Sequence, residues 1–300
     1  MVQVVLRAQL RAMCGLRKAA LKFEDIEGVH DMRVLSRRLR SAITDFKPFL
    51  RKSNLLELQL KAIAKALGAV RDEDVALIGL KDLKAKATGS AADGIALLGK
   101  ESENRQSEAR LALTEVLSND AISDFRKELL TRIDGVTLKS RSRSRTAPDF
   151  SFGNLGAEVL KMRLDEMVAA GSVIYSPFEV KQLHELRILA KRLRYSLELF
   201  ADCWEADLVA IAKEVALLQT SLGELHDCDM WIEKLSERLQ KAPEEKEPTE
   251  ESNQLRDGAT WLLKHFTKER MEHYRDALAR WQEWGASGFL ETLKSTITVH

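Results

Sequence analysis

The stretch from Val29 to Leu50, VHDMRVLSRRLRSAITDFKPFL, has a counterpart from Leu183 to Trp204, LHELRILAKRLRYSLELFADCW. The two stretches align at an offset of 154 residues, which pairs His30 with His184 and each of Arg33, Arg37, Arg38 and Arg40 with another basic residue. A second matched pair follows, LGAVRDEDV at residues 67–75 and LGELHDCDM at residues 222–230. Self-similarity at a fixed offset is typical of a duplicated architecture. The sequence therefore predicts two halves that share one plan.

Each copy of the first stretch has the pattern of an amphipathic helix. At 100° per residue its apolar and basic side chains fall on separate arcs, so one face is expected to pack and the other to carry charge. The apolar arcs are Val29, Met32, Leu35, Leu39, Ile43 and Phe46 in the first copy, and Leu183, Leu186, Leu193, Leu197 and Phe200 in the second. The basic arcs, called here the first and second stripe, are His30, Arg33, Arg37 and Arg40, and His184, Arg187, Lys191 and Arg194.

The two stripes favour a binding face over an ordinary solvated face, which is the usual meaning of a single basic stripe. Solvated helix faces mix acids and bases four residues apart for mutual support, and neither stripe contains an acid. Arginine offers a planar fork that suits oxyanions, and ten residues of helix rise about 15 Å, enough to meet several phosphates. Further basic residues expected to contribute at second rank are Arg7, Arg11, Arg38, Lys61, Lys65, Arg192 and Lys213.

These motifs resemble the CHAD family, named for its conserved histidine α-helical domain. The resemblance rests on His-x-x-Arg-Val/Ile, then Arg/Lys-Arg-Leu-Arg and an aromatic residue, in both copies, with Leu-Gly and Asp-x-Asp downstream. It covers nearly the whole chain. It implies an all-α fold of two pseudo-symmetric antiparallel helical bundles with a basic groove or pore between them, and non-catalytic binding of inorganic polyphosphate, in some members at polyphosphate granules. One departure is that Val70-Arg71-Asp72 becomes Leu225-His226-Asp227 in the second copy.

The rest of the chain also reads as helical, since it has only five prolines and no sustained β-branched alternation. We expect a first bundle over residues 1–138, a polar linker over 139–152 and a second bundle over 153–300. Within each half a helix is expected to end near the Leu-Gly pair, at Gly68 and at Gly223, before another begins. Asp72 and Asp74 are then expected to cap the new helix.

Composition excludes several classes of function. The net charge is only +1, so an anionic partner must be met by local clusters of basic residues. Three scattered cysteines indicate neither a disulfide framework nor a zinc site, and no metal or cofactor is expected. The N-terminus lacks an uninterrupted apolar segment, and no apolar run approaches the ~20 residues that span a bilayer. The resulting expectation is a cytoplasmic protein without a membrane partner, and the family resemblance adds an association with polyphosphate granules.

Two other functions compete with polyphosphate binding. His184-Glu185-Leu186-Arg187 looks like the phosphoacceptor tetrad of histidine kinases, which would make the chain a phosphotransfer protein. Ile188-Leu189 follows in place of the usual Thr/Asn-Pro, and no glycine-rich ATP-binding segment is present, so we expect no enzyme. Nucleic-acid binding is the third reading, because Arg-rich helices suit phosphate backbones. The stripes contain no aromatic side chains for stacking on bases, which disfavours single strands.

The two stripe histidines make a prediction of their own. Neighbouring cations should keep both imidazoles neutral in the empty protein, and bound phosphate should then raise their pKa. Binding would take up protons and tighten as the pH falls.

Overall fold

The computed structural model describes residues 1–47, 50, 54–135, 152–205, 207–241 and 249–298, and within these ranges the chain is helical and has no strand. The predicted all-α class is confirmed. By its internal contacts the chain divides into two compact units, Met1–Lys86 with Ala96–Pro148, and Ala87–Ile95 with Asp149–His300. The predicted linker over 139–152 lies outside the described residues except for Phe152.

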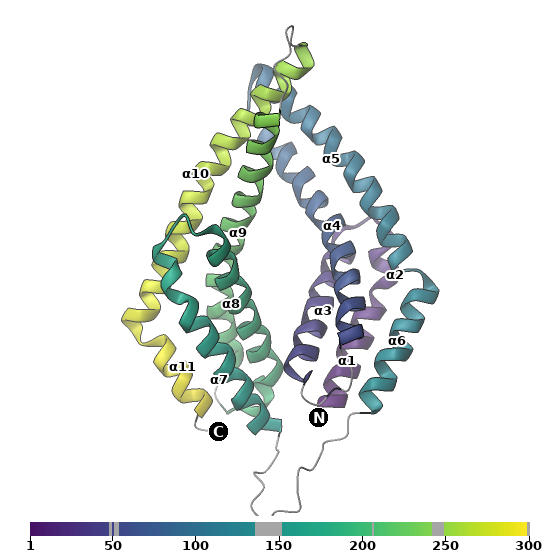
Figure 1. Ribbon diagram of the computed structural model, residues 1–300, viewed down its shortest axis with the longest axis vertical. Helices are drawn as coiled ribbons and strands as arrows, with labels where there is room; N and C mark the ends of the chain where they lie inside the picture. Colours follow the sequence, from purple (N-terminus) through teal and green to yellow (C-terminus); the bar gives the residue numbers. More distant parts are fainter. Residues whose placement is uncertain (48–49, 51–53, 136–151, 206, 242–248, 299–300) are drawn as a thin grey trace, which may run out of the picture. The chain divides into compact units, whose positions relative to one another are not determined.

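The first unit is built around α3, which packs against α1, α2 and α4 (Figure 1). Asp25 caps α3, because its side chain accepts a hydrogen bond from the backbone N–H of Glu27 at 2.8 Å. The apolar arc predicted for this helix is buried except for Leu35, which is partly exposed. The helices of this unit are α1 (Val2–Gly15), α2 (Arg17–Ala20), α3 (Ile26–Asp45), α4 (Asn54–Lys84), α6 (Asn119–Asp134) and all but the start of α5 (Gly89–Val116), whose residues up to Ile95 belong to the second unit.

The second unit is built around two long helices, α9 and α10, with α8 packed on the side of α9 and α7 on α8 (Figure 1). All five predicted apolar positions of α8 are buried to 2% exposure or less. The helices of this unit are α7 (Phe152–Ala170), α8 (Val180–Phe200), α9 (Leu208–Lys241), α10 (Glu250–Ser287) and α11 (Phe289–Thr298), with short 3-10 turns η2 (Gly171–Tyr175) and η3 (Ala201–Cys203).

One close helix crossing in the second unit depends on glycine. A Cβ atom at Gly94, near the start of α5, would lie 1.8 Å from the backbone oxygen of Gln254 in α10. A Cβ at Gly258 would lie 2.7 Å from the carbonyl carbon of Gly94. The two backbones therefore approach more closely than any side chain allows.

The predicted helix ends near Gly68 and Gly223 are wrong. Helix α4 runs unbroken from Asn54 to Lys84, and α9 runs unbroken from Leu208 to Lys241. Asp72 and Asp74 lie inside α4 and cap no helix. Glycine and aspartate favour helix ends in isolation, but here both residue types serve contacts with neighbouring helices, described below.

Other helix boundaries differ less. The chain before α3 forms two helices, α1 and α2, that meet at Leu16, and α3 ends at Asp45 although the matched stretch continues to Leu50. Gly288 adopts a left-handed conformation with φ of 66°, which ends α10 before α11 begins. Among the described residues, no helix combines the length and the apolar character that crossing a membrane requires.

Candidate functional site

Both predicted stripes lie on the accessible side of their helices. On α3, His30, Arg33 and Arg37 are partly exposed and Arg40 is exposed. On α8 all four stripe residues are partly exposed. Each stripe therefore combines a packed helix with side chains that solvent can reach.

A glycine on the neighbouring helix makes room for the first arginine of each stripe. In the first unit Arg33 Nη1 donates to Asp72 Oδ1 at 3.1 Å, and a Cβ added at Gly68 would lie 2.9 Å from that Nη1 atom. In the second unit a Cβ at Gly223 would lie 3.5 Å from Nε of Arg187. The glycine of each Leu-Gly motif thus lets an arginine guanidinium lie close to the backbone of the neighbouring helix. The sequence had instead predicted that these glycines end helices.

The last two arginines of the first stripe have no side-chain partner within the described part of the chain. The side chains of Arg37 and Arg40 form no ion pair or hydrogen bond with any other described residue. Two unpaired guanidinium groups on successive turns of one helix repel each other, which costs stability unless an anion joins them. In the second stripe Arg194 lies 3.7 Å from Glu198, so its charge is partly neutralised.

The histidine of the second stripe, His184, forms a pair with His226 of α9 that was not predicted from the sequence. The rings of His184 on α8 and His226 on α9 lie 4.0 Å apart between centroids, tilted by 40°. The Nδ1 atoms of both rings are buried and have no hydrogen-bond partner among the described residues. His226 stands where the first copy has Arg71, whose Nη1 atom is likewise buried without a partner. The signal was visible as the Arg71/His226 difference, but the pairing depends on how α8 and α9 pack.

The electrostatics of this pair favour neutral rings. Burial lowers the pKa of His184, and the positive charges of Arg187 and Lys191 lower it further. Burial also lowers the pKa of His226, to about 4, with His184, Arg187 and Lys191 adding to the effect. For His184 the direction agrees with the expectation from its sequence neighbours, but burial rather than like charge is the largest cause.

The second aspartate of each Asp-x-Asp motif points to a different neighbour. Asp74 is buried and accepts from Gln106 at 2.6 Å, with Arg110 at 3.4 Å, both on α5. Asp229 accepts from Arg270 of α10 at 2.6 Å, and Arg270 also donates to the carbonyl of Pro177 at 2.7 Å. These aspartates join α4 to α5 and α9 to α10, which explains why they are found inside helices.

The second-rank residues are scattered. Arg7 is paired with Asp134 of α6. Arg192 is partly exposed, and the remaining members are exposed: Arg11, Arg38, Lys61, Lys65 and Lys213. The described contacts bring none of them into the stripes, and their part in a site stays a prediction.

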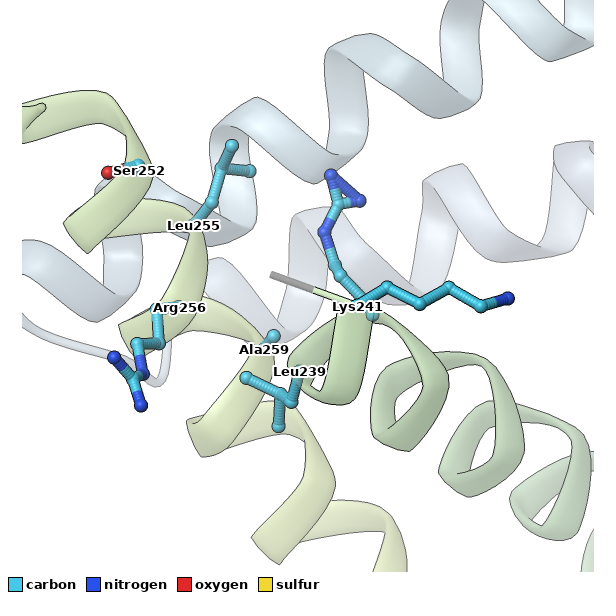
Figure 2. Close-up of a pocket in the computed structure, with 7 residues that line it drawn as sticks. Leu239, Lys241, Ser252, Leu255, Arg256 and Ala259 are labelled. Carbon is cyan, nitrogen blue, oxygen red and sulfur yellow. The ribbon is translucent and has the colours of Figure 1, made fainter. Parts of the chain in front are cut away.

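Two other features were compared with the stripes. Glu27, His30 and Asp31 hold potential metal-ligand atoms within 4.8 Å of one another, but both carboxylates are exposed. A hollow of about 320 Å³ lies where α9 ends and α10 begins, lined by Arg238, Lys241, Arg256, Ser252 and apolar side chains. Figure 2 shows that the cationic ends of Lys241 and Arg256 point away from each other. Lys241 is paired with Glu237 at 2.8 Å, so this hollow is not a convergent anion site.

Comparison with known proteins gives one consistent result. A family model described as CHAD domain matches residues 4–236. The crystal structure of the CHAD domain from the plant Ricinus communis is similar with a TM-score of 0.72 and 20% identity, over 93% of this chain and 90% of that chain. PptA from Streptomyces chartreusis is similar with a TM-score of 0.65 and 18% identity, over 93% of this chain and 99% of that chain. No curated protein matches.

Proposed function

The chain belongs to the CHAD domain family, and we propose that it binds inorganic polyphosphate through the first and second stripes. The observation that carries the proposal is the pair Arg37 and Arg40, two partly or fully exposed guanidinium groups with no partner among the described residues. Like charges on adjacent helical turns are unfavourable by themselves, and a polyanion removes that cost. The matched positions of the second stripe, Lys191 and Arg194, are also basic and partly exposed, although Arg194 lies 3.7 Å from Glu198.

Polyphosphate suits these stripes better than a small metabolite does. A linear phosphate polymer offers repeated charge with no base edges, and it gains affinity by releasing counterions when several phosphates are neutralised. Arginine contributes charge-assisted, bidentate contacts to phosphate oxygens. The absence of aromatic side chains from both stripes favours polyphosphate over single-stranded nucleic acid. The proposed activity is binding without catalysis, and association with polyphosphate granules would follow from it.

The direct test reverses one charge in each stripe. The double variant Arg37→Glu with Lys191→Glu should lose at least about a hundredfold in affinity for long-chain polyphosphate, since two charge-assisted contacts are each replaced by repulsion. Binding is measured by calorimetry, with circular dichroism to verify helical content. The matched control is Lys241→Glu with Arg256→Glu, which makes the same change in net charge at the diverging hollow. Equal binding by the two double variants would exclude the stripes as the site.

Salt and competition separate polyphosphate from other polyanions. Contacts to several phosphates predict that log affinity falls steeply with log salt, and that divalent metal has little effect. Duplex DNA at equal phosphate concentration should displace polyphosphate poorly. Efficient displacement by DNA would favour a nucleic-acid-binding protein instead.

A further inference from the structure

The two stripes differ in one packed position next to the histidine. In the first unit the Val-Arg-Asp segment of α4 carries Arg71, whose charge is fixed at every physiological pH. In the second unit the matching position of α9 carries His226, whose ring lies 4.0 Å from that of His184. The second unit thus has a titrating group where the first has a permanent cation.

Each ring of the pair has a buried nitrogen without a hydrogen-bond partner among the described residues. A buried polar atom without a hydrogen-bond partner costs about 1–3 kcal/mol, and here both Nδ1 atoms are in that state. Arg187 and Lys191 act on both rings and add positive charge around them. A negatively charged group beside the pair would favour protonation of the rings and offset the positive charge around them.

We propose that His184 and His226 form a proton-coupled anion site, in which one phosphate of the polymer binds together with one proton that the pair takes up. The inference rests on the proposed function and extends it to how that function is regulated. A single proton is expected because a second imidazolium would face the first across 4.0 Å. The second unit would then hold polyphosphate more tightly in acid, whereas Arg71 gives the first unit a fixed charge at the same position.

Groups on the neighbouring helices agree with this assignment. From α8, the cations Arg187 and Lys191 oppose protonation of the pair in the absence of an anion, and Glu185 favours it weakly at His184. On the opposite side, α10 directs its charges to other residues of α9: His273 to Glu224, Arg270 to Asp229, and Glu269 toward Cys228. A bound phosphate would favour the charged form and so oppose this preference for neutral rings.

The sign of the coupling follows from linkage. The empty pair is neutral at pH 7, since burial and the neighbouring cations lower the pKa of both rings. A bound phosphate favours the charged form, so binding takes up a proton and affinity rises as the pH falls. One proton allows at most a tenfold gain in affinity per pH unit.

The test measures affinity for long-chain polyphosphate by calorimetry from pH 8 to pH 5, at constant ionic strength and in buffers of different ionisation enthalpy. Long chains are used because their interior phosphates stay ionised throughout this range. We expect about a tenfold gain in affinity for the parent protein between pH 7.5 and 5.5. His226→Arg should bind polyphosphate more tightly than the parent at pH 7.5 and lose most of the gain in affinity on acidification. His226→Gln should bind less tightly than the parent at pH 5.5 and should also lose this gain.

A matched control removes a histidine outside the pair. His265→Gln is suitable because His265 stacks on Trp261 at 5.6 Å in α10, remote from the stripe sequence, and it should keep the parent's pH profile. If His226→Arg and His226→Gln keep that profile too, or if the parent takes up no proton, the coupled pair is refuted while polyphosphate binding stands. If the parent binds no polyphosphate at any pH, the proposed function fails and this inference fails with it.

Discussion

Replacing Gly68 with alanine tests the site through the helix that supports it rather than through a charged residue. The added Cβ would lie 2.9 Å from Nη1 of Arg33, which is closer than real Cβ contacts allow. The backbone of α4 cannot move easily, so the flexible guanidinium must shift away from the added Cβ, which disturbs its 3.1 Å contact with Asp72. The substitution therefore displaces one stripe cation without changing the charge of the protein.

The structure allows the two consequences to be separated. Alanine in place of glycine inside a helix contributes about 1 kcal/mol. Loss of the Arg33–Asp72 pair costs about 0–1 kcal/mol, because 68% of the Asp72 side chain is exposed. Stability should change little. Loss of a charge-assisted contact to phosphate costs about 1.5–3 kcal/mol, which lowers the affinity for polyphosphate about 10- to 100-fold.

Two further glycines serve as controls for Gly68→Ala. Gly79→Ala lies on the same helix, and its added Cβ meets nothing within 4 Å, so affinity should stay at the parent value while stability rises. Gly223→Ala places its Cβ 3.5 Å from Arg187, an ordinary contact, and should be tolerated as well. Calorimetry and chemical denaturation measure the two quantities. Unchanged affinity for Gly68→Ala would show that the seat of Arg33 plays no part in binding.

Three predictions concern stability. The pKa of His226, about 4 against an ordinary 6.5, means that the unfolded chain takes up a proton first as pH falls from 6.5 to 4. The loss of stability in that window should be ~1–2 kcal/mol after discounting for a half-exposed ring, and His226→Gln should remove it in pH-dependent denaturation. Gly94→Ala should destabilise the protein by more than about 2 kcal/mol because its Cβ meets the backbone of α10. The control Gly99→Ala, whose Cβ meets nothing within 4 Å, should stabilise it. Equal melting temperatures for the two variants would contradict the close crossing of α5 and α10. Asp229→Ala should cost about 3 kcal/mol by leaving buried Arg270 without its carboxylate, and a loss below 1 kcal/mol would contradict this.

The periodic segments were predictable from the sequence, because burial follows directly from helical spacing. Val29, Met32 and Ile43 in α3, like Leu186 and Leu193 in α8, are buried as their arcs require. Leu35 is the exception, since it lies at the margin of its arc and stays partly exposed. Strong local pattern and tertiary burial agree in these helices.

Helix continuity and the histidine pair were not predictable in the same way. Gly68 and Asp74 are each typical of a helix end, yet one seats Arg33 and the other accepts from Gln106 of α5. Both contacts depend on how helices distant in sequence pack together, and this information is absent from a local window. His226 was visible as a difference from Arg71, but its 4.0 Å approach to His184 depends on the register of α8 against α9.

The long helices also explain how a chain of net charge +1 can present two basic stripes. One side of α9 directs Gly223 and His226 toward α8, and another directs Glu224 and Asp229 toward bases of α10. Helix α4 follows the same division, with Gly68 beside the first stripe and acids such as Glu73, which pairs with Arg105 at 3.0 Å, facing α5. These acids are thus neutralised inside each unit by bases of α5 or α10. Asp72 pairs with Arg33, but the exposed face of α3 keeps Arg37 and Arg40, which no described acid reaches. Net charge is therefore a poor guide to the partner of this protein, because the distribution of charge among helix faces decides where a polyanion can bind.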